Sequence, residues 1–337
     1  MRIAILGPGG IAAKHSAAAR ALGHELVGSA GRDLARTEMF AREHGGAAFT
    51  DLDRMIDAVA PELLIVALPP FAHDGEVEHA AARGLHLLCE KPAALDLGRA
   101  ERMVAAAEAA GVTAANGFIY RFGDAVRAWQ AADAGPVGLF AGGYHCNALH
   151  APWWREQARS GGQLVEQVIH QIDLIRLFMG AAGQGSGDAQ QRWKAGGGEP
   201  DTVYARRANL FHRDVEGYTA EDVTAVVFGW DDGRLATLTA TNIATPGLWW
   251  KAWEVFAERL TGRFTSWNAA AFTPTVAGAE PVRIEGATDV FQAQLADVVA
   301  AIGERRAPRV TLADGVATLR LALAARDAAA ERCEVRL

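Results

Sequence analysis

A glycine turn between a short strand and a helix, at the start of the sequence, constrains the fold more than any other feature. Residues 3–6 are an unbroken apolar run, which is typical of a strand buried on both faces. Glycines follow directly, and apolar residues at helical spacing then extend over 11–22. A strand that turns through glycine into a helix begins a βαβ unit, so we expect a parallel sheet.

Three small residues of this turn have separate physical tasks. Gly7 permits the tight turn, Gly9 lets the backbone approach a pyrophosphate, and Ala12 allows the helix to pack close to the sheet. The helix N-terminus offers free N–H groups and a positive dipole to phosphate oxygens. The turn therefore predicts dinucleotide binding; the alternative is a glycine-rich turn without a ligand.

Strands and helices alternate up to Phe118, and the rhythm then changes. The later strands include a predicted hairpin around Asp231-Asp232-Gly233, where glycine supplies the positive φ of the turn. We expect an α/β protein with a dinucleotide-binding domain over 1–118. Residues 119–337 are expected to form a substrate-binding and oligomerisation α/β domain with a large, mostly antiparallel open-faced sheet, and its terminal helices can pack back on the first domain. Predicted strands lie at 25–30, 63–68, 85–89, 113–115, 138–144, 223–230, 234–241, 249–258 and 263–267, and predicted helices at 32–44, 75–83, 97–110, 161–180, 289–303 and 312–332.

Composition excludes several classes of partner. The net charge of -7 and the lack of a basic stretch argue against nucleic acid and anionic membranes. No apolar run approaches the roughly 18 residues of a membrane span. The N-terminal strand runs straight into the glycine turn, so it is not a signal peptide, and three scattered cysteines suggest a reducing cytosol. We expect a cytoplasmic protein.

A metal site is not expected. His145, Asn147 and His150 lie close together in the sequence, but they have no acidic partner.

Glu90-Lys91-Pro92 closes the predicted strand at 85–89. A lysine at the C-terminal end of a parallel strand stands where open α/β sheets bind ligands. The alternative is a solvated lysine at a strand end.

The predicted helix over 161–180 carries a polar stripe on an otherwise apolar surface. Glu166 and His170 are four residues apart, and Asp173 continues the same face. The ordinary pKa of histidine, near 6.5, suits His170 to proton transfer around neutrality. The alternatives are a hydrogen-bonded core histidine, a Glu166 that complements the helix dipole, and an Asp173 with a structural contact.

The end of the second strand suggests NADP rather than NAD. An NAD-binding chain usually places an acid there to bind the ribose 2′-OH, but this strand is followed by Gly31 and Arg32. Arg32 can stack on adenine and face a 2′-phosphate, with Ser29 a weaker candidate. Arg32 can instead be a solvated helix residue, and NAD stays open.

These motifs together resemble the Gfo/Idh/MocA oxidoreductases (glucose–fructose oxidoreductase, inositol dehydrogenase and relatives). The resemblance covers essentially the whole chain, and the set is far more specific than any one motif. It rests on Gly7-Pro8-Gly9-Gly10-Ile11-Ala12, Leu68-Pro69-Pro70 with His73, Glu90-Lys91-Pro92, Asn116-Gly117-Phe118-Ile119-Tyr120-Arg121-Phe122, Trp154-Arg155, the segment 161–173 and Thr311-Leu312-Ala313-Asp314-Gly315.

The resemblance implies a Rossmann domain, a C-terminal α/β domain, and dimers or tetramers built through its sheet. One face of that sheet is expected to pack on helices, and Trp249, Trp250 and Trp253 are candidates for the other face, where they would favour oligomerisation. The implied activity is NAD(P)-dependent hydride transfer at a CH–OH group of a sugar, inositol or related polyol.

The resemblance also implies the site residues. Lys91 would contact the nicotinamide ribose and the reacting hydroxyl, and His170 would be the general base. Glu166 stands where many members carry Asp, which puts its contact in doubt. The implied cofactor residues are Gly7, Pro8, Gly9, Gly10, Ile11, Ala12, Arg32, Leu68, Pro69, His73, Glu90 and Lys91, and the implied substrate residues are Lys91, Tyr120, Arg121, Trp154, Arg155, Glu166, His170 and Asp173.

Three other functions remain open on the sequence. One is a non-catalytic dinucleotide-binding sensor or regulator. The others are an NAD-dependent glycosidase and a dihydrodiol dehydrogenase-like reductase within the same family.

Overall fold

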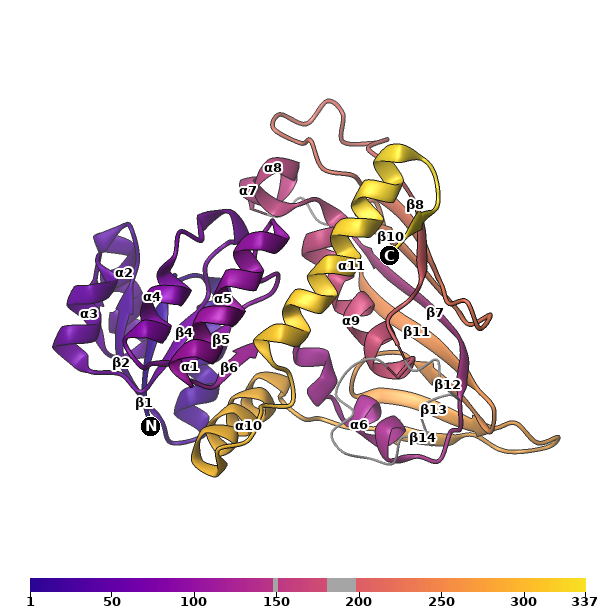
Figure 1. Ribbon diagram of the computed structural model, residues 1–337, viewed down its shortest axis with the longest axis horizontal. Helices are drawn as coiled ribbons and strands as arrows, with labels where there is room; N and C mark the ends of the chain where they lie inside the picture. The colour runs from indigo at the N-terminus through magenta and orange to yellow at the C-terminus, as the bar shows by residue number, and fades with distance from the viewer. Residues whose placement is uncertain (148–150, 181–197) are drawn as a thin grey trace. The chain divides into compact units, whose positions relative to one another are not determined.

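The computed structural model describes residues 1–147, 151–180 and 198–337 (Figure 1). They form two compact units. The first unit is Met1–Ile119 with Asp289–Val316, and the second is Tyr120–Thr288 with Ala317–Leu337. The predicted division into domains 1–118 and 119–337 stays a prediction.

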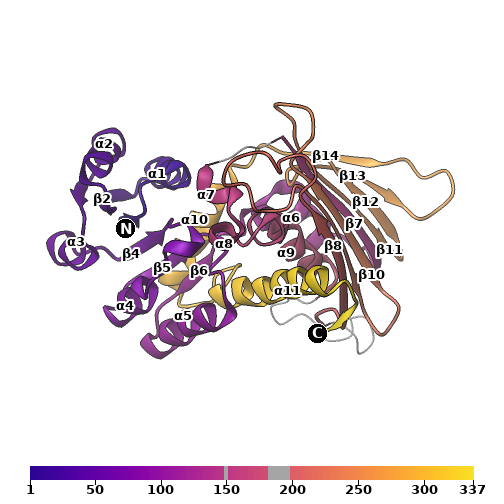
Figure 2. The same ribbon diagram turned by 90° about the horizontal axis from the view of Figure 1, so that it is seen from above.

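The first unit is built on a six-stranded parallel sheet with the strand order β3-β2-β1-β4-β5-β6. Helices α1, α2 and α10 lie against one face and α3, α4 and α5 against the other (Figure 2). This doubly wound arrangement confirms the expected Rossmann fold. Its strands are β1 (Arg2–Leu6), β2 (Glu25–Ala30), β3 (Ala47–Phe49), β4 (Leu63–Val66), β5 (His86–Cys89) and β6 (Ala114–Asn116), and its helices are α1 (Gly10–Ala21), α2 (Leu34–His44), α3 (Leu52–Val59), α4 (Glu76–Ala82), α5 (Leu97–Ala110) and α10 (Val290–Glu304).

Helix α10 joins this unit although it follows in sequence by some 170 residues. Leu295 and Val298 of α10 belong to the same buried cluster as Ile3, Ile65 and Leu88 of the sheet. The apolar face of α10 therefore completes one side of the first core.

The second unit contains a nine-stranded sheet with the order β14-β13-β12-β11-β7-β10-β9-β8-β15. Neighbouring strands are antiparallel except β7 and β10, which confirms the mostly antiparallel sheet. Its strands are β7 (Val137–Cys146), β8 (Thr202–Ala208), β9 (Val223–Gly229), β10 (Leu235–Thr241), β11 (Trp249–Ala257), β12 (Leu260–Phe264), β13 (Ala269–Pro274), β14 (Val282–Glu285) and β15 (Val335–Arg336), and its helices are α6 (Asp124–Ala131), α7 (Pro152–Arg155), α8 (Gln157–Ser160), α9 (Ile169–Phe178) and α11 (Leu312–Glu331), which begins in the first unit.

The hairpin between β9 and β10 is confirmed, with Gly233 at a φ of 96°. Helices α6, α9 and the later part of α11 lie on one side of the sheet, and no helix of the described residues covers the other side (Figure 2). We call these the helix face and the open face. The prediction that three tryptophans share the open face is wrong: Trp250 lies there beside His145, but Trp253 is 2% exposed and stacks on Phe264.

The alternation of β-strand side chains explains this difference. Residues at odd positions of β11, including Trp253, pair with β7 residues such as Gly142, where a Cβ would approach the Gln171 side chain of α9. Trp253 therefore enters the core while its neighbour at position 250 points the opposite way.

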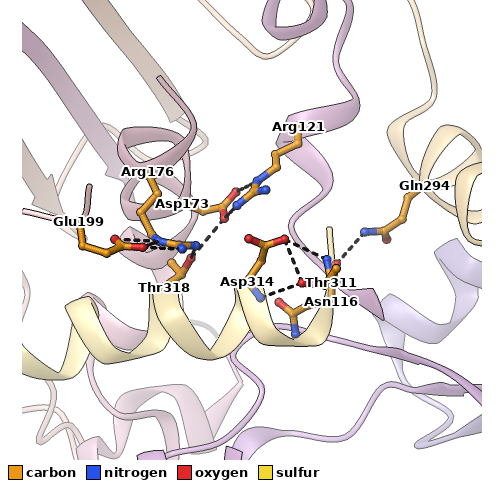
Figure 3. A network of polar contacts seen from close by, with 9 residues as sticks. All are labelled: Asn116, Arg121, Asp173, Arg176, Glu199, Gln294, Thr311, Asp314 and Thr318. Carbon is orange, nitrogen blue, oxygen red and sulfur yellow. Dashed lines mark hydrogen bonds and ion pairs between the residues drawn. The ribbon is translucent and has the colours of Figure 1, made fainter. Parts of the chain in front are cut away.

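The start of α11 is tied to β6 in the first unit (Figure 3). The Asp314 carboxylate accepts hydrogen bonds from the backbone and hydroxyl of Thr311, and the Thr311 hydroxyl accepts one from the Asp314 N–H. Gly315 is required because a Cβ there would lie 2.5 Å from Cγ of Asn116. This reciprocal cap explains the Thr311–Gly315 motif of the sequence.

No helix of the described residues is both long and apolar enough to cross a membrane.

Candidate active site

The glycine turn leaves its backbone open to a ligand. Gly7 has a φ of 92°, and a Cβ there would lie 2.8 Å from the carbonyl oxygen of Ala67, so only glycine fits. A Cβ at Gly9 would meet nothing closer than 3.9 Å, and one at Gly10 would meet nothing within 4 Å. Side chains at these two positions would fill space that the chain leaves empty. Ala12 is fully buried against the sheet.

Helix α1 also lacks a side-chain cap. Its N-cap is Gly9, and its first turn contains no acid. By contrast, aspartates cap α2, α3, α5 and α10 of the same unit. The first N–H groups of α1 and its positive dipole are thus left for an anion. These residues fit the pyrophosphate of a dinucleotide.

One arginine, Arg32, follows β2, and a second, Arg36, lies in the first turn of α2. Arg32 is exposed, and no acid lies at the strand tip. The Asp33 carboxylate caps α2 by accepting from the Arg36 N–H at 3.1 Å. The Arg36 guanidinium lies 3.9 Å from a Cβ built on Gly9, so it stands beside the glycine turn. The sequence had indicated Arg32 but not Arg36, whose exposed helical position gave no signal.

The Leu68-Pro69-Pro70 segment follows β4 next to Gly7. The Leu68 Cδ2 atom would lie 3.0 Å from a Cβ on Gly7. His73, after the short 3₁₀ helix η1 (Pro70–Ala72), is buried, and its Nδ1 bonds the Glu76 carboxylate. Burial would raise the pKa of Glu76, but the hydrogen bond and charge of His73 outweigh it and lower that pKa. His73 is thereby fixed in one ring orientation.

Glu90 holds the candidate catalytic lysine by its backbone. One carboxylate oxygen accepts from the Lys91 N–H at 3.1 Å, and the other lies 2.7 Å from Nε2 of His15. A Cβ on Gly117 would be 2.8 Å from this carboxylate, so glycine makes the room. The Lys91–Pro92 bond is cis, as expected. His15 was missed, although a histidine three residues after Ala12 stands on the same side of the helix.

In the second unit, a glycine pair leads into the polar helix. Gly161 and Gly162 have φ of 81° and 86°, and a Cβ on Gly162 would lie 2.5 Å from the Glu221 carboxylate. That carboxylate accepts from the Leu164 N–H at 3.1 Å. The start of the helix is therefore fixed by a buried acid from the loop before β9.

The helix predicted over 161–180 is divided. A π-helical turn, η3 (Leu164–Val168), carries Glu166, and α9 follows with His170 in its first turn. Glu166 is 6% exposed and His170 9% exposed. Such turns occur frequently at functional sites, because they shift side chains relative to a regular helix.

The side chains of Arg121 and Asp173 point toward one another and form an ion pair (Figure 3). Two nitrogens of the Arg121 guanidinium donate to the two carboxylate oxygens of Asp173 at 2.8 and 2.5 Å. Both side chains are 1% exposed, and the Thr318 hydroxyl also donates to Asp173 at 3.3 Å. This geometry supports the structural alternative for Asp173.

A hollow of about 270 Å³ of empty space, open solvent at its mouth included, gathers three of the predicted residues. Gly162, Gln163 and Gln167 flank Glu166 in the segment 161–173, but no site role was predicted for them. Tyr218, Ala220 and Asn242 were missed, because they are far from that segment in sequence. Tyr218 and Asn242 are joined by a 3.2 Å hydrogen bond. The hollow is lined by Trp154, Arg155, Gly162, Gln163, Glu166, Gln167, Tyr218, Ala220 and Asn242.

The His170 imidazole is held in a stack of rings. Its ring centroid lies 4.4 Å from that of Tyr120, and the Tyr120 centroid lies 4.5 Å from that of Trp267, in the connection between β12 and β13. Burial raises the pKa of Tyr120 well above its ordinary value, so its hydroxyl stays protonated. The sequence indicated Tyr120 but not Trp267.

Within the described residues, no group of three or more histidine, cysteine or carboxylate side chains is arranged to hold a metal ion. His150, one of the three residues considered for a metal, lies outside the described residues.

Comparison with protein families matches both parts of the chain. Residues 1–118 match the model for the oxidoreductase family with an NAD-binding Rossmann fold, GFO_IDH_MocA, and residues 124–261 match the GFO/IDH/MocA C-terminal domain. The chain belongs to the Gfo/Idh/MocA family. This membership confirms the resemblance inferred from the motifs.

Individual members of the Gfo/Idh/MocA family are similar over different lengths. Glucose-6-phosphate 3-dehydrogenase of Bacillus subtilis (strain 168) is 40% identical over 122 residues, which are 36% of this chain and 34% of that protein. D-xylose 1-dehydrogenase (NADP(+)) 2 of Haloferax volcanii is 24% identical over 95% of this chain and 94% of that protein. The matches to the first curated relatives span 34% to 53% of their length.

Among solved structures, a levoglucosan dehydrogenase in complex with NADH and levoglucosan has the same fold. It superposes with a TM-score of 0.86 at 18% identity, covering 100% of this chain and 99% of that one.

Proposed function

We propose that the protein is an NAD(P)-dependent oxidoreductase acting on a CH–OH group of a sugar, inositol or related polyol. The observation that carries this proposal is the Glu90 carboxylate. It binds the Lys91 backbone on one side and His15 of the dinucleotide helix on the other. The lysine is therefore held in a fixed place relative to the open glycine turn.

Lys91 stabilises the reacting oxygen. When bound, the nicotinamide supplies or accepts the hydride. As hydride leaves the carbinol carbon, negative charge develops on its oxygen, and an ammonium at that oxygen lowers the energy of the transition state.

His170 accepts the hydroxyl proton. Its imidazole is oriented by the Tyr120 ring, so one nitrogen can be presented to a substrate hydroxyl without loss of further rotational freedom. Glu166 orients His170 or binds a second hydroxyl. The amides of Gln163 and Gln167 line the same hollow and suit a polyhydroxylated ligand.

Trp154 and Arg155 complete the proposed substrate contacts. An indole ring can lie against the apolar face of a sugar ring, and a guanidinium donates to ring substituents. Substrate contact by Arg121 and Asp173 stays a prediction, which their mutual ion pair does not favour.

The finer cofactor proposal is NADP. Two guanidinium groups, of Arg32 and Arg36, stand where an acid would bind the 2′-OH of NAD, and the Asp33 carboxylate is engaged as a helix cap. A 2′-phosphate would satisfy this positive charge.

We also propose a cytoplasmic homodimer or homotetramer built through the open face. Four large apolar side chains are exposed on it at 38% to 46% of their surface: Tyr204, Val227, Leu235 and Trp250. Light scattering of the protein and of Trp250→Glu tests this, since a charge in a buried interface would shift the mass toward the monomer.

Turnover tests the activity. Purified protein is assayed against a panel of sugars, sugar phosphates and inositols with both dinucleotides. Lys91→Ala should lower kcat by about 10²–10³-fold or more while reduced dinucleotide still binds. Lys14→Ala, an exposed lysine on α1, is the matched control and should keep full turnover.

Other outcomes would favour the alternatives. Tight NADPH binding without turnover on any substrate would favour a sensor. Release of an aryl group from a glycoside without net NADH would favour an NAD-dependent glycosidase. If Lys91→Ala lowers kcat only modestly, Lys91 does not have its proposed role.

A further inference from the structure

Lys251 occupies an unusual place on the helix face of the second unit. The chain contains 33 basic residues, of which only four are lysines: Lys14, Lys91, Lys194 and Lys251. On β11, Lys251 pairs directly with Tyr144 of the neighbouring strand β7 (Figure 1), so both side chains point to the helix face. Lys251 is partly buried, and its place on the helix face needs a physical reason, because moving an ammonium out of water is costly.

Aromatic rings supply that reason. The Lys251 ammonium lies between 5.1 and 5.5 Å from the ring centroids of Tyr120, Tyr144, Trp249 and Trp267. We call these four rings the aromatic cage. Each of these contacts attracts the ammonium to the negative face of a ring, and the attraction grows as water is excluded. The cage and the ammonium therefore hold one another in place.

The rings of the cage are themselves fixed. The Trp249 indole donates to the Tyr144 hydroxyl at 2.9 Å, and Tyr120 stacks on Trp267 with an interplanar angle of 22°. Tyr120 is 2% exposed. The Lys251 ammonium therefore contacts rings that have little freedom to rotate.

One ring of the cage is also the support of the candidate base. Tyr120 stacks on His170 at 4.4 Å with an interplanar angle of 16°. We propose that Lys251 is a positioning residue for His170, acting through the Tyr120 and Trp267 rings. This rests on the proposed function, in which His170 takes the hydroxyl proton.

The proposal predicts a change in kcat rather than in binding. If the cage loses its cation, the Tyr120 ring and the imidazole on it gain freedom, and the nitrogen is less often aligned with the substrate proton. Lys251→Met keeps an unbranched side chain, one heavy atom shorter, but removes the charge. It should lower kcat by about tenfold or more, with KM and dinucleotide affinity changed by less than about threefold.

Two variants make the test specific. Lys251→Arg restores a cation that stacks on aromatic faces, and it should recover most of kcat. Lys14→Met is the control for loss of a lysine elsewhere. If Lys251→Met keeps kcat within twofold, or if Lys251→Arg loses as much as Lys251→Met while both remain folded, the proposal is wrong.

A spectroscopic measurement separates this proposal from the proposed function. In a ring-selective NMR spectrum of labelled histidines, the His170 Cε1–H signal, assigned with His170→Gln, should be displaced by the ring current of Tyr120. The displacement should shrink in Lys251→Met and in Trp267→Leu, and it should persist in Lys14→Met. An unchanged signal in both cage variants overturns the proposal, even for a protein that turns over no sugar. If Lys251→Met does not fold, Trp267→Leu decides by the same signal.

Discussion

The Nε2 atom of His15 lies 2.7 Å from Oε1 of Glu90, and this contact joins the dinucleotide helix to the segment that carries the candidate catalytic lysine. His15 is fully buried and Glu90 is 8% exposed. Because the second carboxylate oxygen holds the Lys91 N–H, one acid connects two parts of the first unit that lie 75 residues apart. A carboxylate buried in this way requires its donors.

His15→Leu removes one of those donors. We expect a loss of about 1–3 kcal/mol in the free energy of unfolding, because the Glu90 oxygen is left buried without its partner. The looser Lys91 backbone should also lower kcat by roughly tenfold. Urea unfolding and steady-state turnover measure the two effects. His79→Leu, which breaks an exposed pair with Asp53, is the control and should change little. Equal losses in both variants would contradict the role of burial.

Cofactor preference should depend on Arg32 and Arg36. Replacing either with alanine should weaken NADPH binding by about tenfold and leave NADH nearly unchanged, since only NADPH carries the 2′-phosphate. Fluorescence titration with both dinucleotides measures this. Arg42→Ala, in the last turn of the same helix, is the matched control. A wild-type protein that binds NADH more tightly than NADPH would contradict the proposal for NADP.

The Arg121–Asp173 pair should contribute to stability rather than to substrate binding. Arg121→Met or Asp173→Leu alone leaves a buried charge uncompensated and should cost about 3–5 kcal/mol. The double variant should lose less than the two single variants added together, because neither charge remains. Urea unfolding measures this. Arg336→Met, which breaks an exposed pair with Asp231, should have little effect. A raised KM with unchanged stability would instead support substrate contact.

The stability contributed by the Glu76–His73 contact should depend on pH. The folded-state pKa of Glu76 is lowered, so its ionised form stabilises the fold above its unfolded pKa of about 4.3, and this contribution is lost as the pH falls through the folded pKa. Near neutral pH, Glu76→Gln should therefore have a lower melting temperature than the wild type, which corresponds to a loss of about 1–2 kcal/mol in the free energy of unfolding. The difference between the two proteins should disappear as the pH falls below about 4. Thermal melts across pH measure this. Glu38→Gln, an exposed site on α2, should show no such pH-dependent difference.

The first unit was largely predictable from the sequence, because its signals are local. The apolar run of β1, the turn at Gly7 and the helix after it are consecutive, and the position of Lys91 follows from the end of one strand. Strand β3 was missed, since the three residues Ala47–Phe49 give too short an apolar pattern, and helix α3 after it was also missed. The place of α10 was left open, because its packing on the first core involves residues more than 170 positions away.

The second unit was less predictable, because strand pairing and ring packing decide it. Periodicity placed Glu166, His170 and Asp173 on one face, but it did not show that Asp173 would meet Arg121 while Glu166 would line the hollow. The π-helical turn between Leu164 and Val168 also has no signal in hydrophobic spacing.

The sequence by itself determined the alternating α/β order, the glycine turn, the lysine at the strand end and the helix that carries the histidine. These features are encoded within short stretches, where backbone freedom and apolar spacing suffice. Only the tertiary structure decided that His15 meets Glu90, that Trp253 enters the core while Trp250 stays outside, and that the Lys251 ammonium lies close to four rings. Such contacts depend on the register between strands and on charges that can be buried only with a partner, and no single segment of the chain contains both partners.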